Sequence, residues 1–250
     1  MTAMRLKRYP SPSGGFALGK MGVGATMLKQ GKTARDYVQD GLIAMWDGIE
    51  NAGWGVHDPN ATVWTNLIEG NDTLPMRANW SFRDNSVYIA RRNSVNTNIP
   101  SACFRTAYQA EKWHAEMALY AEMTDINSDA GFIIYNQKFG LWMKPTPILT
   151  TRNVANQVTL CSSPSGINFG IRVSSEDSHY VEFFKNGSLF VRQQAWGGTD
   201  VGPLSSIAPT QNPSCGFDMR IYSWRIYSRA LTAEEIAHNY AIDKERFNLP

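Results

Sequence analysis

The stretch MRIYSWRIYSRALTAEEI, residues 219 to 236, indicates the fold most clearly because its pattern predicts one long strand that ends at a helix. Its apolar and polar residues alternate, and alternate residues of a strand point to opposite faces of a sheet. The set that we expect to face a core is Tyr222, Trp224, Ile226, Ser228 and Ala230. The set on the other face is Ile221, Ser223, Arg225, Tyr227 and Arg229.

The strand ends at a helix start that can be recognised from two residues. Thr232 is followed three positions later by Glu235, which is the spacing of a capping box. In that arrangement each side chain accepts a hydrogen bond from a backbone N–H group that the helix itself leaves without a partner. A short helix should therefore follow residue 232.

The same stretch resembles the closing strand of laminin-G-like, concanavalin A-like jelly rolls, which reads Arg-Ile-Tyr-x-Arg-Ala-Leu-(Thr/Ser)-x-x-Glu-Ile and leads into a helix. In this chain the pattern runs from Arg225 to Ile236. The segments DGLIAMWD, residues 40 to 47, and VWTNL, residues 63 to 67, resemble the beginning of that domain. The resemblance covers residues 36 to 250 and implies an all-β antiparallel sandwich with a short C-terminal helix.

The remainder of the chain favours the same fold class. Strand-like segments follow one another without intervening helical periodicity, which is typical of an antiparallel sandwich. Residues 114 to 123 alternate strictly despite their good helix formers, so we predict a strand there. Asn186 and Gly187 predict a type I′ hairpin turn, since both residue types accept positive φ angles. A chain of 250 residues has room for one large domain at 36 to 250.

Residues 1 to 35 differ from this body and predict an extended, Gly-rich arm that anchors it to a partner. No Asp or Glu precedes Asp36. The basic residues of the arm are Arg5, Lys7, Arg8, Lys20, Lys29, Lys32 and Arg35. The arm contains no element that reads nucleic acid, so we expect no nucleic-acid partner. We also expect no membrane span, because no apolar run of about 18 residues occurs.

Catalytic and metal-binding motifs are weak. Glycanases on this architecture carry Glu-x-Asp-x-x-Glu on one strand face, and the chain has no such motif. Glu116 and Glu122 are expected to be solvated charges, and we predict a protein that is not an enzyme. Asp125, Asn127 and Asp129 have the alternating oxygens of a calcium loop, although a polar turn explains them better. No other cofactor is expected.

Aromatic and polar residues in Gly-rich segments are the candidates for glycan binding, because flat rings stack on sugars and amides orient hydroxyls. These candidates are Trp54, His57, Asp58, Asn60, Trp64 and Trp196. The alternative is that such tryptophans anchor loops or fill the core, as large aromatics often do. We expect Trp46, Trp113 and Trp224 to lie in the core.

The segment DYVQDGLIAMWDGIENAG, residues 36 to 53, resembles the opening of laminin-G-like proteins that are common in phages of gut bacteria. The resemblance implies a virion structural protein that decorates the capsid, forms a head fibre or belongs to the tail. Such a protein would assemble in the host cytoplasm as a homo-oligomer with other virion proteins and attach to a protein or a cell-surface glycan. The alternatives are a carbohydrate-binding module on the bacterial surface or outside the cell, and a glycoside hydrolase on the same fold.

Overall fold

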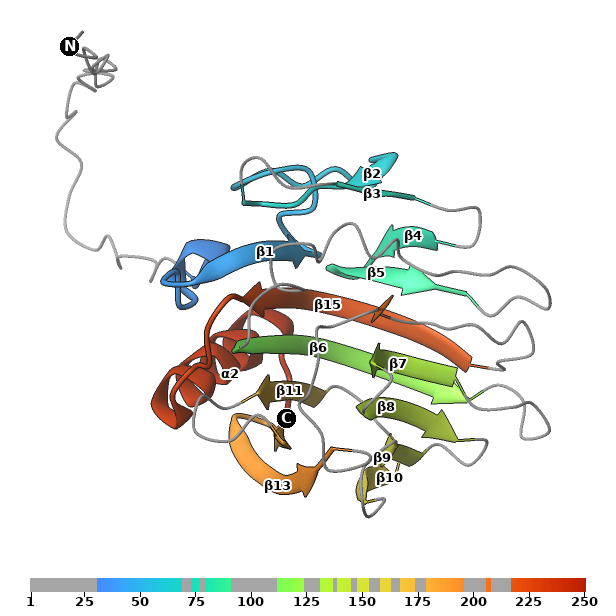
Figure 1. Cartoon of the computed structure of the whole chain (residues 1–250). Helices are drawn as coiled ribbons and strands as arrows, with labels where there is room; N and C mark the ends of the chain where they lie inside the picture. The colour runs from blue at the N-terminus through green and yellow to red at the C-terminus, as the bar shows by residue number, and fades with distance from the viewer. Residues whose placement is uncertain are drawn as a thin grey trace, which may run out of the picture. The chain divides into compact units, whose positions relative to one another are not determined.

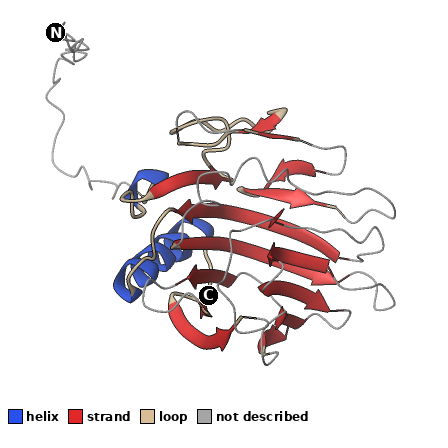
Figure 2. Cartoon of the chain, viewed as in Figure 1, coloured by secondary structure: helices blue, strands red, loops and turns tan. Residues whose placement is uncertain are grey.

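The computed structural model describes residues 31–68, 73–76, 80–90, 112–123, 131–136, 139–144, 148–152, 158–162, 167–173, 179–195, 206–207 and 217–250. Strands dominate this part of the chain, and one long helix follows the last of them (Figures 1 and 2). Residues Gly31–Pro250 form one compact unit. The predicted antiparallel β-sandwich with a C-terminal helix is confirmed.

The larger sheet has eight antiparallel strands in the described part of the chain, in the order β13-β12-β11-β6-β15-β5-β4, and β1 pairs with β15 as well. Its strands are β1 (Leu42–Asp47), β4 (Trp80–Arg83), β5 (Ser86–Ile89), β6 (Trp113–Met123), β11 (Ile167–Val173), β12 (Tyr180–Lys185), β13 (Ser188–Gln194) and β15 (Phe217–Tyr227). The strand predicted from residue 114 is β6. The predicted hairpin joins β12 to β13 with φ values of 49° at Asn186 and 74° at Gly187.

Two smaller sheets complete the described strands. One has five strands in the order β10-β9-β8-β7-β14, and the other pairs β2 with β3. Their bounds are β2 (Val63–Trp64), β3 (Leu74–Pro75), β7 (Gly131–Asn136), β8 (Phe139–Lys144), β9 (Ile148–Arg152), β10 (Thr159–Ser162) and β14 (Ser206–Ile207).

β15 is the central strand of the large sheet. Along one edge it pairs with β6 from Phe217 to Tyr227. Along the other edge it pairs first with β5, through residues 219 to 221, and then with β1, through residues 223 to 227. The C-terminal strand therefore joins three segments from the first half of the chain, and Figure 1 shows it between β5 and β6.

One face of the large sheet, the core face, is packed with apolar side chains. Trp46 of β1 stacks on Trp224 of β15 with ring centroids 4.6 Å apart. Trp113 on β6 is also fully buried. The placement of these three tryptophans in the core is confirmed, and they provide much of the buried apolar area that stabilises the sandwich.

A β-bulge in β15 corrects the predicted alternation. Ile221 pairs with Leu119 of β6, but Ser223 already pairs with Ala118, so Tyr222 is an extra residue. An extra residue shifts every later side chain to the opposite face. Ile221 therefore joins Trp224 on the core face, whereas Tyr222 leaves that face, contrary to the sequence prediction.

The helix α2 (Ala233–Phe247) packs on the opposite face of the large sheet, which we call the outer face. Its capping box is confirmed: Thr232 Oγ1 accepts the N–H of Glu235, and the Glu235 carboxylate accepts the N–H of Thr232. A single 3-10 turn, η1 (Ala34–Asp36), precedes β1 and has a capping box of its own at Thr33.

Gly48 shows how closely the strands meet at the bulge. Its N–H donates to the carbonyl of Tyr222, and a Cβ atom placed on it would lie 2.1 Å from the Asn85 carbonyl oxygen. No rotamer change can relieve a clash between a Cβ and a backbone atom. Only glycine fits where β1 ends beside the β4–β5 turn.

We predict that Gly48→Ala lowers the free energy of unfolding by about 3 kcal/mol or more, because the added methyl must displace backbone. Chemical denaturation measures the change. Gly31→Ala is the matched control, since nothing lies within 4 Å of a Cβ at that position. Equal stability of the two variants would contradict the close approach.

Candidate functional site

The outer face of the large sheet carries polar side chains in two groups, and α2 covers only one of them. The covered group is centred on Arg225 of β15, whose side chain is fully buried. Its Nη2 atom lies 2.8 Å from Glu116 Oε2 on β6 and 2.7 Å from Asp243 Oδ2 on α2. Glu116 is thus buried and paired, which corrects its predicted exposure to solvent.

The helix presents a polar stripe to this group. Asn239 donates to Glu116 Oε1 at 2.7 Å, and Asp243 Oδ1 accepts the hydroxyl of Tyr37 at 2.6 Å. Arg246, one further turn along, donates to Asp47 Oδ2 at 2.6 Å. Positions i, i+4 and i+7 of a helix share one face, so the stripe joins α2 to three separate parts of the body.

The electrostatics of this group are those of a paired, desolvated cluster. Burial opposes ionisation of Glu116, but Arg225 and the hydrogen bond from His114 outweigh it and lower the pKa of Glu116 to about 2. Burial also opposes the charge on Arg225, yet Asp243 and Glu116 raise its pKa well above the usual value. Because Arg225, Glu116 and Asp243 are fully buried and already paired, they hold the helix and are closed to a ligand.

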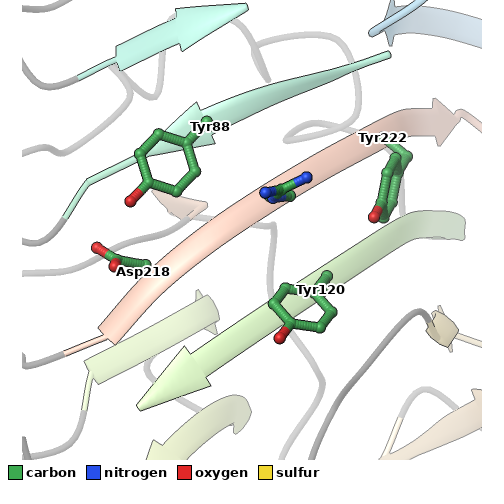
Figure 3. A pocket seen from close by; sticks show the side chains of 5 residues that line it. Tyr88, Tyr120, Asp218 and Tyr222 are labelled. Carbon is green, nitrogen blue, oxygen red and sulfur yellow. The ribbon is translucent and has the colours of Figure 1, made fainter. Parts of the chain in front are cut away.

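The second group lies on the same face beyond the end of α2 and lines an open pocket of about 340 Å³. Three neighbouring strands supply the lining residues, which are Tyr88 of β5, Tyr120 of β6, and Asp218, Arg220 and Tyr222 of β15. Figure 3 shows the labelled side chains rising from these strands on one side of the sheet. All five are half-buried, so each combines a fixed position with access from solvent.

Strand register places the central three in a row. Arg220 is directly opposite Tyr88 on one side and Tyr120 on the other. Directly opposite side chains are close enough to interact across strands. The Arg220 guanidinium lies 5.9 Å from the centroid of the Tyr88 ring, and its Nη1 atom lies 2.7 Å from Asp84 Oδ2 in the β4–β5 turn.

Neighbouring residues hold two of the lining tyrosines, Tyr88 and Tyr222, in place. Arg83 stacks on the Tyr88 ring, with its guanidinium carbon 4.3 Å from the ring centroid. Burial raises the pKa of Tyr88, and so does Asp218, which accepts a hydrogen bond from its hydroxyl. Tyr222 lies against Phe247 at the end of α2, with ring centroids 5.4 Å apart. The described lining of the pocket thus has aromatic surfaces, one cation and one carboxylate.

The bulge in β15 explains why Tyr222 reaches this pocket. Without the extra residue, Tyr222 would lie on the core face, and Asp218 and Arg220 would share a face with Trp224. The bulge lets one strand present a polar outer face along its whole length while it keeps its apolar residues in the core.

Comparisons with solved structures agree with this architecture. A mutant of Trypanosoma rangeli sialidase displaying trans-sialidase activity superposes with a TM-score of 0.57 at 12% identity, over 81% of this chain and 33% of that one. T. rangeli sialidase in complex with 2,3-difluorosialic acid gives 0.55 at 13% identity, over 83% and 34%. The binding domain of Paraclostridial Mosquitocidal Protein 1 gives 0.56 at 12% identity, over 80% and 52%.

The chain has a concanavalin A-like β-sandwich fold. It spans about a third of the length of the sialidases and about half of the mosquitocidal binding domain. Identities of 12 to 13% establish the fold alone. No protein-family model matches the sequence, and no curated protein matches it.

The structure places the predicted glycan-binding residues in different surroundings. Trp64 is fully buried and donates from Nε1 to the carbonyl of Asp47, so it fills the core and has no face to offer a sugar. Trp54 is half-buried, and the Arg35 guanidinium stacks on its ring at 4.3 Å. The prediction is corrected for Trp64, because its side chain completes the apolar cluster.

The other described candidates lie in one loop. His57 Nδ1 is 2.9 Å from the carbonyl oxygen of Ile49. The side chain of Asn51 bonds to the backbone of Asp58, and the Asp58 carboxylate accepts the N–H of Asn60. These bonds shape the loop. They do not direct its side chains toward the pocket described above.

The remaining predicted residues lie mostly outside the described residues, so those predictions stay open. They are Trp196, the calcium candidates Asp125, Asn127 and Asp129, and the arm residues Arg5, Lys7, Arg8, Lys20 and Lys29. Lys32 lies 3.6 Å from Asp36, and both it and Arg35 belong to the described body. No group of three or more potential metal ligands occurs among the described residues. No helix in the described ranges is long and apolar enough to cross a membrane.

Sequence reasoning missed the lining residues of the pocket. Tyr120 falls within the strand predicted over residues 114 to 123, but nothing in the sequence says that β5 and β6 both border β15. Tyr222 was assigned to the core because alternation cannot reveal a bulge. The one available signal was a tyrosine on the polar side of each of two separate strands.

We predict that acid weakens the attachment of α2 through Glu116. The folded-state pKa of about 2 lies below the ordinary value of 4.5, so the ionised carboxylate stabilises the fold above pH 4.5. This contribution is lost as the pH falls from 4.5 toward 2. Other carboxyl groups titrate in the same window, so the test compares the wild type with Glu116→Gln. Denaturation at each pH should show a stability difference that shrinks toward pH 2, and a constant difference would refute the assignment.

Proposed function

We propose that this protein is a non-catalytic binding domain that holds a glycan in the pocket lined by Tyr88, Tyr120, Asp218, Arg220 and Tyr222. The observation that carries the proposal is the row in which Arg220 lies between two tyrosines on adjacent strands. Tyrosine rings offer apolar faces to the C–H side of a sugar, while charged groups and hydroxyls bind its hydroxyls.

The rigidity of the pocket supports this proposal. Its residues lie on paired strands, and Tyr222 and Tyr88 are held by Phe247 and Arg83 respectively. A site that is already ordered loses little conformational entropy when a ligand binds. The likeness to sialidases and to a mosquitocidal binding domain is one of fold, and it is compatible with a sugar-binding role.

The absence of catalysis is part of the proposal. Glycoside hydrolysis generally needs two carboxyl groups on either side of the scissile bond. Among the described residues that line the pocket, Asp218 is the one carboxylate, and the nearby Asp84 is paired with Arg220. Release of reducing sugar from a bound glycan by the pure protein would overturn this part.

The setting that we propose is a phage virion, in which the domain is displayed as a structural protein and the part of residues 1 to 35 that precedes the described body anchors it to other virion proteins. Two features of the sequence support it: the resemblance of residues 36 to 53 to laminin-G-like phage proteins, and the basic run before Asp36. Mass spectrometry of purified particles tests it. A protein found at the bacterial surface instead of in particles would favour the carbohydrate-binding module.

We predict that Tyr120→Ala weakens binding to a glycan identified on an array by about tenfold or more, because a lost stacking surface is worth roughly 1.4 kcal/mol or more. Tyr180→Ala is the matched control. Tyr180, like Tyr120, is a half-buried tyrosine of the large sheet; it lies on β12 and stacks with Arg192 at 4.4 Å.

In the strand register, Tyr180 lies just past the row that contains Val173 and Trp113, at one end of the sheet. Tyr120 lies toward the opposite end. Titration calorimetry with both variants should therefore show a loss for Tyr120→Ala alone. Equal effects of the two substitutions, or no glycan bound by the wild type, would remove the pocket as the site.

A further inference from the structure

The aromatic lining of the pocket also indicates how long a piece of glycan it takes, given the glycan-binding function proposed above. Two aromatic platforms lie on the outer face. The first, the Tyr88 platform, is the Tyr88 ring of β5 with the Arg83 guanidinium stacked on it at 4.3 Å. The second, the Tyr120 platform, is Tyr120 of β6 together with Tyr222 of β15, which line the same pocket (Figure 3). A sugar ring can therefore rest at two places.

Strand register sets the distance between the two platforms. Tyr88 and Tyr120 are both directly opposite Arg220, so their backbones are two strand spacings apart. Neighbouring strands lie about 4.8 Å apart, which puts the two tyrosine backbones about 10 Å from each other. A pyranose ring with its glycosidic oxygen is about as long as one strand spacing. Two successive sugar rings therefore match the distance between the platforms, and a single ring does not.

Arg220 lies between the two platforms and can serve both sugars. Its Nη1 atom donates to Asp84 at 2.7 Å, which orients the guanidinium toward the β4–β5 turn. A guanidinium has five N–H donors, so an arginine that is paired with one carboxylate oxygen can also donate to sugar oxygens. These donors lie in the row between Tyr88 and Tyr120, where the linkage between two bound sugars would lie.

The end of α2 limits the direction that a bound chain can take. Tyr222 contacts Phe247 with ring centroids 5.4 Å apart, and Arg225, further along β15, is buried beneath the helix. A glycan therefore cannot continue along β15 past Tyr222. Across the strands, the row continues instead from Tyr88 to the half-buried Ser81 of β4, which is directly opposite it.

We propose that the pocket binds two successive sugar units of a glycan chain that runs across the strands. One unit rests on the Tyr88 platform and the next on the Tyr120 platform, and Arg220 donates to oxygens near the linkage between them. The ligand class is thus an oligosaccharide or a polysaccharide, because a single sugar occupies only one of the two platforms.

The test is a chain-length series with the full-length protein. The probes are made from the array glycan by partial hydrolysis, and they are its single sugars and its fragments of two and three units. Titration calorimetry should show two-unit fragments bound about tenfold or more tightly than any single sugar. Tyr88→Ala and Tyr120→Ala each remove one platform, so in either variant this gap should largely close.

Tyr180→Ala is the control, because Tyr180 is a half-buried tyrosine of the same sheet that stacks with Arg192 at 4.4 Å, much as Tyr88 stacks with Arg83. It should keep the full gap. Single sugars bound by the wild type as tightly as two-unit fragments would overturn the inference while the proposed function stands. Failure to bind the fragments and the intact array glycan would overturn both. A gap that both Tyr88→Ala and Tyr120→Ala leave unaltered would overturn the assignment of one sugar to each platform.

Discussion

The structure depends on a buried arginine that joins three elements. Arg225 of β15 contacts Glu116 of β6 and Asp243 of α2 at 2.8 and 2.7 Å, and the Tyr37 ring lies 4.0 Å from its guanidinium carbon. A buried ion pair is not in itself strong evidence of net stability, since desolvation offsets much of the attraction. Loss of one partner, however, leaves an uncompensated buried charge that costs about 3–5 kcal/mol. The triad therefore specifies where the helix packs.

The position of α2 divides the outer face of the large sheet into two parts. Over the half of β15 that holds Ser223 and Arg225, the helix excludes solvent, and polar groups there are paired with one another. Over the half that holds Asp218 and Arg220, the helix has ended and the face stays open. The same strand thus supplies a buried structural cluster and the open pocket in which we propose that a glycan binds.

The bulge at Tyr222 links these two halves. Because of the bulge, apolar residues both before and after Tyr222 in β15 lie on the core face. Tyr222 itself lies on the outer face, at the boundary between the two halves. Tyr222 contacts Phe247 at the end of α2 and also lines the pocket. The helix that the buried triad holds in place thus also supports one wall of the pocket.

Local patterns of alternation, turn residues and capping were enough to predict the class of the fold, the strand at β6, the hairpin at Asn186 and the capped helix after Thr232. Only the tertiary structure decided that Glu116 is buried, that Trp64 fills the core, and that Tyr88, Arg220 and Tyr120 form a row. The physical reason is that burial and cross-strand contact depend on which strands are neighbours and where a bulge occurs. These are long-range properties, and a residue's own neighbours in the chain do not encode them.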